Sequence, residues 1–428
     1  MDILKKCIQV LENNWRDNFT IPSDRLYPFQ WNWDSGFSAI GNSYIHPERA
    51  LIEMETLFSG QWENGFLPHI VFHNSARYSS YFPSADYWES QISDFAPKKV
   101  KTSGITQPPV HGFVLERLYG FGLDKKRIES LLRKLIDYHL YLYHYRMYKE
   151  TGLIKILHNW ESGMDNSLWW DAILNKIDKN DVENIALNRK DINEVADSQS
   201  TRPKDDDYRK YLFLLKKLKS EKYEKIPENH PFQVICPVFN SILVKSNESI
   251  FKLASIFNIE VNELKKWHNS TIKNFDAYLF DNNTNLYFPY DTISATQIKV
   301  ICSGSFIPIF ANIPSKDIAI KMTDKIFEDK NNIPIPSCFL SEQGHEEKNY
   351  WRGPVWVNIN WMVYQGLLKY KLFKLADKLY ENTIDLVQKQ GVFEYFNPNK
   401  NTDEIRGYGG ANFSWTAALI IDMIKTKK

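Results

Sequence analysis

Apolar residues recur at helical spacing along almost the whole chain, and this pattern limits the fold more than any other feature. After a proline, Ser315 is placed to cap a helix, and the apolar stripe of that helix consists of Ile318, Ala319, Met322 and Ile326. Similar stripes lie in 1–14, 36–44, 48–60, 107–121, 125–149, 206–221, 235–257, 264–275, 298–311, 355–370, 372–391 and 412–426. The pattern predicts about a dozen helices.

Segments typical of strands are scarce, and the best candidate is 279–291, which predicts a short hairpin or an extended loop. Successive helices with motif-rich loops between them indicate paired helices stacked around a ring. The longest stretches without periodicity are 61–106 and 151–204, and long loops in compact domains are commonly functional. Because no linker rich in Gly, Ser and Pro interrupts the chain, we expect one domain over 1–428.

The charges nearly cancel, since 53 Lys and Arg face 52 Asp and Glu. No global field therefore favours nucleic acid or an anionic membrane as a partner. The sequence contains no run of about 18 apolar residues, so no membrane span is predicted. The start of the sequence lacks the apolar core of a signal peptide. We expect a soluble, cytoplasmic protein, and the sequence leaves its oligomeric state open.

Metal and disulfide sites are not predicted. Four widely spaced cysteines form no C-x-x-C pair: Cys7, Cys236, Cys302 and Cys338. The run 205–207 is acidic, but it precedes a predicted helix, where the helix dipole favours carboxylates. The segment from Asp281 resembles the front of an EF-hand loop, yet Leu286 stands where that loop requires glycine.

The stretch HNWESGMDNS, 158–167, places Glu161 and Asp165 around a Ser-Gly-Met turn. Cleavage of a glycosidic bond needs one carboxylic acid to protonate the leaving oxygen and a second carboxylate to attack or to activate water, without metal or cofactor. Glu394, in the aromatic loop EYFNPN, is the candidate for the second group. The alternative is structural: Asp165 would cap a helix or order its loop, and Glu394 would belong to a turn.

Aromatic rings beside polar residues suit a cleft that holds a sugar by its apolar face, although core packing accounts for roughly half of such rings. The segment YPFQWNWDSGF supplies Tyr27, Trp31, Trp33 and Asp34, in which Asp34 can accept hydrogen bonds from vicinal hydroxyls. Another cluster lies in NYWRGPVWVNINW, with Trp351 and Trp356 as candidates for the same role and core packing as the alternative.

Taken in order, seven segments resemble the inverting α-glycosidases of glycoside hydrolase family 63, in particular the small bacterial and plant branch of mannosylglycerate and glucosylglycerate hydrolases. The segments are FQWNWDSGF, GQWENGFLPH, WESGMDNS, STRPKDDDY, YWRGPVWVNINW, FEYFNP and NFSWTAAL, and they extend from residue 29 to 419. The resemblance implies an all-α fold of (α/α)6-barrel type, in which six helical hairpins form a ring and long loops form the active-site face.

The resemblance also implies roles for single residues. Asp165 matches the general acid of the family and Glu394 the general base. The subsite for the cleaved sugar would be lined by Trp31, Trp33, Asp34 and Gln107, with Tyr27 nearby.

In this branch of the family, an arginine and a tyrosine hold the glycerate carboxylate, and Arg202 and Tyr208 match them. The chain departs from the pattern after GMDNS, where residues 168–171 read LWWD instead of Pro-Arg-Trp-Asp. The segment 172–200 matches no family segment.

The sequence therefore predicts an inverting α-glycosidase that acts on a small-molecule sugar substrate of the glucosyl- or mannosylglycerate type, which carries a carboxylate. One alternative is an α-glucosidase of trehalase or oligosaccharide-trimming type, which has no need for Arg202. The other is a sugar-binding or sugar-isomerising barrel without hydrolytic activity, which should lack one of the two carboxylates.

Overall fold

The computed structural model describes the chain except residues 1, 74–80, 190, 195–197, 400–406 and 428. Helices dominate the described residues, and twelve of them form two sets. The inner set buries most of its side chains and comprises α2 (Asn32–Asn42), α5 (His111–Gly120), α12 (Pro237–Ile256), the 3-10 helix η5 (Ser303–Ile309), α15 (Val357–Lys369) and α17 (Ser414–Thr426). The outer set is more exposed and comprises α1 (Ile3–Asn14), α3 (Pro47–Phe58), α6 (Lys125–Arg146), α13 (Asn262–Leu279), α14 (Lys316–Phe327) and α16 (Phe373–Gln390).

The sequences of the two sets explain this difference. In α16 the buried residues Ala376, Leu379, Thr383 and Val387 recur every three or four positions, which gives one apolar face. In α17 the five residues 417–421 are all apolar and all buried, so this helix is covered on every side. The predicted helices are confirmed with one exception.

The exception is 298–311, where the structure contains the 3-10 helix η5 instead of an α-helix. Pro308 lies inside η5 and has no N–H to donate to the preceding turn, which disfavours a continuous α-helix there. The predicted hairpin at 279–291 is confirmed, because β8 (Phe280–Asp281) pairs with β9 (Leu286–Tyr287) in antiparallel fashion.

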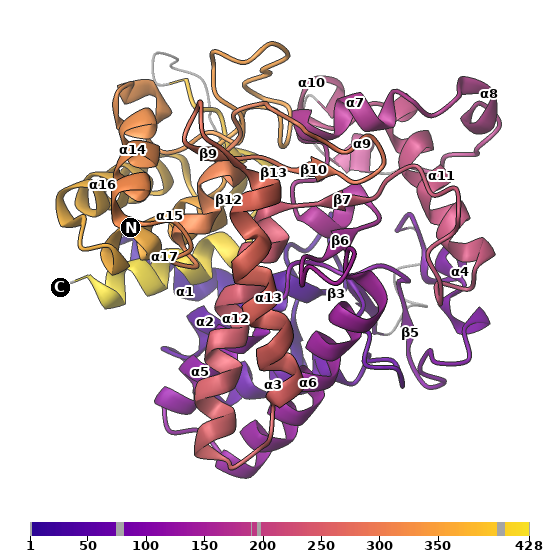
Figure 1. The fold of residues 1–428 in the computed structure, drawn as a ribbon. Coiled ribbons are helices and arrows are strands. Elements are labelled where there is room, and N and C mark those ends of the chain that lie inside the picture. Colours follow the sequence, from indigo (N-terminus) through magenta and orange to yellow (C-terminus); the bar gives the residue numbers. More distant parts are fainter. Residues whose placement is uncertain (1, 74–80, 190, 195–197, 400–406, 428) are drawn as a thin grey trace.

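The inner helices follow one another in chain order and return to their start. Successive contacts run from α2 to α5, α12, η5, α15 and α17, and α17 packs back on α2. Each outer helix packs against an inner neighbour, with α1 lying against α17. Figure 1 shows this seam, where the yellow α17 runs beside the indigo α1 and α2.

Polar contacts join the seam. The Asn14 amide donates to the Ser414 hydroxyl over 2.9 Å. The buried carboxylate of Asp422, on α17, accepts hydrogen bonds from the indole of Trp361 at 2.7 Å and the hydroxyl of Tyr44 at 2.8 Å, and it pairs with Arg117 at 2.5 Å. One carboxylate thus connects α17 with α15, with α5 and with the end of α2.

Small sheets and short helices lie between the long helices. The strands are β1 (Trp15–Arg16), β2 (Phe19–Thr20), β3 (Gln30–Trp31), β4 (Ile70–Phe72), β5 (Lys101–Thr102), β6 (Lys155–Ile156), β7 (Val234–Ile235), β10 (Tyr290–Asp291), β11 (Thr296–Gln297), β12 (Phe393–Phe396) and β13 (Gly407–Ala411). The sheet orders are β1-β2, β3-β4-β5, β6-β7-β10-β11 and β12-β13, and every pairing is antiparallel.

The remaining helices are short except α11. They are α4 (Ala85–Trp88), η2 (Ser90–Ile92), η3 (Asn159–Ser162), η4 (Leu168–Trp170), α7 (Asp171–Leu174), α8 (Lys179–Val182), α9 (Asp191–Glu194), α10 (Ser198–Thr201), α11 (Asp205–Ser220) and η6 (Lys330–Asn332). In Figure 1 the helices α7 to α11 gather at one side of the molecule. Within the described ranges, no helix is long and apolar enough to cross a membrane.

Candidate active site

Two adjoining cavities lie where the segments before the inner helices meet. One is lined by Asp34, Asp165 and Glu394 among others, and we call it the carboxylate lobe. The other is lined by Arg202 and Tyr208 among others, and we call it the arginine lobe. The two lobes share a boundary formed by Tyr27, Trp31, His69, Asp165 and Tyr350.

The loop that carries Asp165 is built from a short helix and a glycine. After η3, Gly163 adopts φ 74°, and a Cβ atom there would run into the ring of Trp33, so both the turn and the close approach need glycine. The amide of Asn159 donates to the Asp165 carbonyl over 2.7 Å and fixes the backbone beyond the turn. Asp165 is thereby held at the boundary of the two lobes.

The carboxyl group of Asp165 has few groups that stabilise its ionised form. Burial raises the pKa of Asp165 to about 7, although the charge of Arg202 and a hydrogen bond from the Tyr350 hydroxyl at 3.3 Å act in the opposite direction. The charge of Glu394 adds to the upward shift of this pKa. Near neutral pH, Asp165 can therefore hold a proton.

Glu394 lies on β12, in the β12–β13 hairpin, and its side chain is almost fully buried. Its Oε1 accepts a hydrogen bond from the Tyr27 hydroxyl at 2.8 Å, and its Oε2 accepts one from the backbone N–H of Gly410 at 2.8 Å. Burial raises the pKa of Glu394, but Arg202, whose Nη1 lies 3.8 Å from Oε1, and these two hydrogen bonds oppose the shift. The environment of Glu394 thus favours the ionised form more than that of Asp165 does.

Two tyrosines link the carboxyl groups. The hydroxyls of Tyr27 and Tyr350 lie 3.4 Å apart, and they contact Glu394 and Asp165 respectively. Arg202 donates from Nη1 to the Tyr27 hydroxyl over 3.0 Å, and its guanidinium lies 4.4 Å from the centre of the Tyr350 ring. Five groups from distant parts of the chain therefore form one polar network around the boundary.

The carboxylate lobe has aromatic walls and a third acid. Asp34, in the first turn of α2, is buried; burial raises its pKa well above the usual range, and the charge of Glu394 adds to this. Gln107 accepts a hydrogen bond from the backbone N–H of Trp33 over 3.2 Å, and both residues line the lobe. Trp31 lies at the boundary.

The two tryptophans of the 349–361 segment have different positions. Trp351 lines the carboxylate lobe and stacks on Trp356, with ring centres 3.8 Å apart. Trp356 lies behind it, and its indole N–H donates to the carbonyl of Tyr350 over 2.9 Å. Trp356 lines neither lobe, so it supports the wall from behind instead of forming it.

Tyr350 is the central residue that the sequence analysis does not select. It is a non-glycine residue with φ 46°, a conformation that side chains other than glycine adopt rarely and that often marks functional sites. A signal was present, since it precedes Trp351 in the YWRGPVW segment. Further lining residues that composition does not single out include His69, Tyr81, Trp88, Trp160 and Trp415.

Glu161, the other acid of the opening motif, has a structural environment. It is buried, pairs with Arg146 at 3.2 Å, and accepts hydrogen bonds from the backbone N–H groups of Leu157 at 2.6 Å and Thr106 at 3.2 Å. These contacts occupy its oxygens and tie the loop to α6. Over the parts of the chain that the structure describes, no group of three or more His, Cys, Asp or Glu side chains is arranged to hold a metal ion.

Known proteins with the same features share nearly the full length of the chain. Residues 27–416 match the mannosylglycerate hydrolase MGH1-like glycoside hydrolase domain. A mannosylglycerate hydrolase from Thermus thermophilus is 38% identical over 97% of this chain and 99% of that protein. A glucosylglycerate hydrolase from Mycolicibacterium hassiacum is 29% identical over 97% of this chain and 96% of its own length.

A solved structure gives the same result. The crystal structure of a glycoside hydrolase family 63 mannosylglycerate hydrolase from Thermus thermophilus, in complex with Tris and D-glycerate, superimposes with a TM-score of 0.90 at 36% identity. The match covers 98% of this chain and 99% of that one.

Proposed function

This chain belongs to the mannosylglycerate hydrolase MGH1-like glycoside hydrolases, and we propose that it hydrolyses a glucosyl- or mannosylglycerate to the free hexose and glycerate. The observation that carries this proposal is the position of Asp165 on the boundary of the two lobes. A glycoside that fills both lobes would place its hexose among the carboxyl groups and its glycerate beside Arg202. The bond between the two parts would then lie next to Asp165.

Asp165 acts in this mechanism as the general acid. It donates a proton to the glycosidic oxygen as the bond to the anomeric carbon breaks, and glycerate leaves with a neutral hydroxyl. Burial supports the role, because it raises the pKa of Asp165 to about 7 and keeps the proton available. Tyr350 orients the carboxyl group through its hydroxyl.

Glu394 acts as the general base. It removes a proton from a water molecule that attacks the anomeric carbon from the face opposite the leaving group, so the configuration inverts. Inverting enzymes leave room for this water between the two carboxyls, and two bridging hydroxyls, those of Tyr27 and Tyr350, separate Asp165 from Glu394 here. The Gly410 N–H, the Tyr27 hydroxyl and Arg202 support ionisation of Glu394.

The two lobes divide recognition of the substrate. Asp34 and Gln107 supply hydrogen-bonding groups for the hexose hydroxyls, and Trp33 and Trp351 supply apolar faces for its ring. In the arginine lobe, Arg202 supplies a buried guanidinium for the carboxylate of glycerate, with Tyr208 beside it. A neutral second sugar carries no carboxylate that this guanidinium could bind, which disfavours the trehalase-type alternative.

The closed order of contacts from α2 through α17 supports an (α/α)6 barrel of six helical hairpins, formed by a single domain over 1–428. Most of the proposed site residues then lie in segments that precede or open inner helices, whereas Arg202 precedes α11 and Tyr208 lies within α11.

The decisive experiment is hydrolysis of a panel of glucosylglycerate, mannosylglycerate, trehalose and kojibiose, combined with Arg202→Ala. We expect a glycosylglycerate to be the best substrate. Arg202→Ala should lower kcat/KM for it by roughly 10²-fold more than for a neutral aryl α-glycoside, because only the charged substrate uses the guanidinium–carboxylate pair. Some loss on the neutral substrate is expected too, since Arg202 lies 3.8 Å from Glu394.

Arg209→Ala is the matched control, because Arg209 lies on α11 and pairs with the exposed Asp206 outside both lobes. Proton NMR of the first product should detect the β-anomer before mutarotation. Equal losses of kcat/KM on the charged and neutral substrates would favour a neutral disaccharide as the substrate. Release of the α-anomer would show that Glu394 does not act as the general base.

A further inference from the structure

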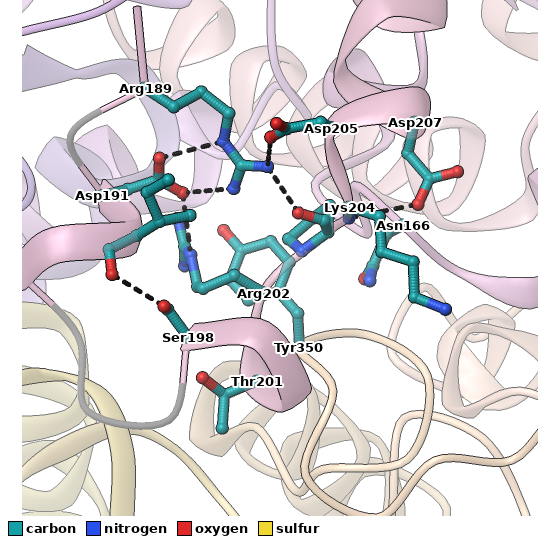
Figure 2. A network of polar contacts seen from close by, with 12 residues as sticks. Asn166, Arg189, Asp191, Ser198, Thr201, Arg202, Lys204, Asp205, Asp207 and Tyr350 are labelled. Carbon is teal, nitrogen blue, oxygen red and sulfur yellow. Dashed lines mark hydrogen bonds and ion pairs between the residues drawn. The ribbon is translucent and has the colours of Figure 1, made fainter.

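Arg189 and Asp191 lie directly behind Arg202 and outside the lining of both lobes. They belong to the segment 172–200, which lies between the segments WESGMDNS and STRPKDDDY. Figure 2 shows Asp191 between the two arginines, with contacts to both. The two guanidinium groups are almost fully buried, with side-chain exposures of 2% for Arg189 and 5% for Arg202.

Arg189 holds the carboxylate of Asp191 through a bidentate contact. The Arg189 Nε donates to Oδ1 over 3.1 Å and its Nη2 donates to Oδ2 over 2.7 Å. The same Oδ2 accepts a hydrogen bond from the Nε of Arg202 at 3.4 Å. Burial alone would raise the pKa of Asp191, but the hydrogen bonds of Arg189 and the charge of Arg202 bring it below its ordinary value, so the group is ionised at neutral pH.

Arg189 also fixes the surroundings of Arg202. Its Nη1 donates to the carbonyl of Pro203 over 2.6 Å and to Oδ1 of Asp205 over 3.1 Å. Its guanidinium lies 3.9 Å from the centre of the Tyr208 ring. Arg189 therefore contacts two residues that line the arginine lobe, Pro203 and Tyr208, without lining it itself.

Arg202 needs such a support because two groups draw it toward the carboxylate lobe. Its Nη1 donates to Tyr27 and lies 3.8 Å from the carboxylate of Glu394. The contact of Asp191 with Nε opposes this attraction from the other edge of the guanidinium. Asp191 also separates two positive charges that would otherwise repel each other at low dielectric.

We propose that Asp191 and Arg189 are positioning residues, which hold the guanidinium of Arg202 in the position that binds a carboxylated leaving group. In this way they set the preference for glycosylglycerates over neutral glycosides. The proposal rests on the function proposed above. It assigns a role to the segment 172–200: this segment completes the carboxylate recognition from behind, without contact with the substrate.

The test is Asp191→Asn, which removes the charge and keeps the size of the side chain. We expect KM for the preferred glycosylglycerate to rise roughly tenfold while kcat changes by less than about threefold, because ground-state contact with the carboxylate is weakened and the proton transfers are not. KM for a neutral aryl α-glycoside should stay within about twofold of wild type. Asp191→Glu, which restores the charge, should recover part of the loss.

Asp206→Asn is the matched control, since Asp206 is an exposed aspartate nearby that pairs with Arg209 instead of Arg202. A second test places Asp191→Asn in an Arg202→Lys background. If Asp191 acts by holding the Arg202 guanidinium, the effect of Asp191→Asn on KM should fall to less than about twofold in the Arg202→Lys variant. Lysine has no Nε–H for Asp191 to hold.

The proposal is overturned if Asp191→Asn leaves KM for the glycosylglycerate unchanged, or if it lowers turnover of charged and neutral substrates alike. It is also overturned if the effect persists fully with Arg202→Lys. Failure of the wild-type enzyme to cleave any glycosylglycerate would instead overturn the proposed function itself, and that outcome is visible before any variant is made.

Discussion

Two buried carboxyl groups with different hydrogen-bond partners stand at the centre of the site. Glu394 receives two hydrogen bonds at 2.8 Å, whereas Asp165 receives one at 3.3 Å. Hydrogen bonds to a carboxylate favour its ionised form, so Glu394 should ionise first as pH rises and Asp165 should keep its proton longer. The two groups titrate as an interacting pair, since the charge of Glu394 raises the pKa of Asp165 and the hydroxyls of Tyr27 and Tyr350 connect them.

The pH profile of kcat/KM should therefore be bell-shaped. Activity should rise as pH increases through the pKa of Glu394, which burial places above its ordinary value, because the base must be ionised. It should fall as pH increases through the pKa of Asp165, about 7, because the acid must hold its proton. Initial rates across the acidic and neutral range measure both limbs; a profile that stays flat above neutral pH would contradict the assignment of Asp165.

Asp165→Asn and Glu394→Gln should each lower kcat by roughly 10²- to 10⁴-fold, because each removes one proton transfer and leaves the packing volume intact. Hexose binding, measured by calorimetry, should persist in both variants. Asp178→Asn serves as a control, since Asp178 caps α8 at the surface through the N–H of Asn180. Wild-type turnover by either active-site variant would exclude that residue from catalysis.

At the scale of single residues, the sequence identifies some members of the site and not others. Asp165, Glu394 and Asp34 stand in short aromatic segments whose composition points to a site, and all three line one lobe. Tyr350 could not be selected by composition, because its role depends on a backbone turn with φ 46° that brings its hydroxyl between distant groups. Trp351 and Trp356 carry the same side chain, and only packing places one in the wall and the other behind it.

At the scale of elements, the β12–β13 hairpin positions Glu394 through glycines. Gly409 adopts φ 72°, and a Cβ atom there would collide with Oε2 of Glu394. Gly409→Ala should therefore lower kcat by roughly 10-fold or more by displacing that carboxylate, and the positive φ should cost stability of about 1–3 kcal/mol. Steady-state kinetics and thermal unfolding check the two quantities.

Gly122→Ala is the matched control, because Gly122 has a similar φ of 78° but open space around its Cβ position. Both variants carry the same kind of backbone strain, so the collisions with Glu394 and with the neighbouring Tyr395 ring distinguish them. An equal loss of kcat in both would mean that strain, and not displacement of the carboxylate, explains the effect.

Helices were more predictable than the segments between them. A stripe such as Ala376, Leu379 and Thr383 reports one buried face directly. The periodicity in 298–311 is the same kind of signal, but the backbone requirement of Pro308 overrides it. Segments 61–106 and 151–204 have no periodicity because their short strands and helices are fixed by partners far away in the chain, as β3-β4-β5 and β6-β7-β10-β11 show.

At the scale of the whole molecule, Asp422 joins the end of the ring to its beginning. Asp422→Ala should lower the free energy of unfolding by roughly 3 kcal/mol, because it removes hydrogen bonds to a buried charge and leaves Arg117 and Trp361 without their acceptor. Denaturant titration should show a lower midpoint with an unchanged slope. Activity at low temperature should be retained, since Asp422 lines neither lobe.

Asp385→Ala is the corresponding control on α16, where Asp385 pairs with Lys389 in a largely exposed contact at 2.8 Å. An exposed pair of this kind contributes about 0–1 kcal/mol. If both variants were equally stable, the polar contacts of the seam would not contribute to closure of the ring.

The seam between α17 and α2 also has a consequence for biosynthesis. The ribosome makes α2 early and α17 only after Glu394, so a nascent chain has an open flank on α2 until residues 414–426 have emerged. At a synthesis rate of about 5–20 residues per second, this apolar flank of α2 stays uncovered by α17 for roughly tens of seconds. For part of that interval the chain contains Asp165 but not yet Glu394, so we expect the two carboxyl groups of the site to come together only after most of the chain has been made.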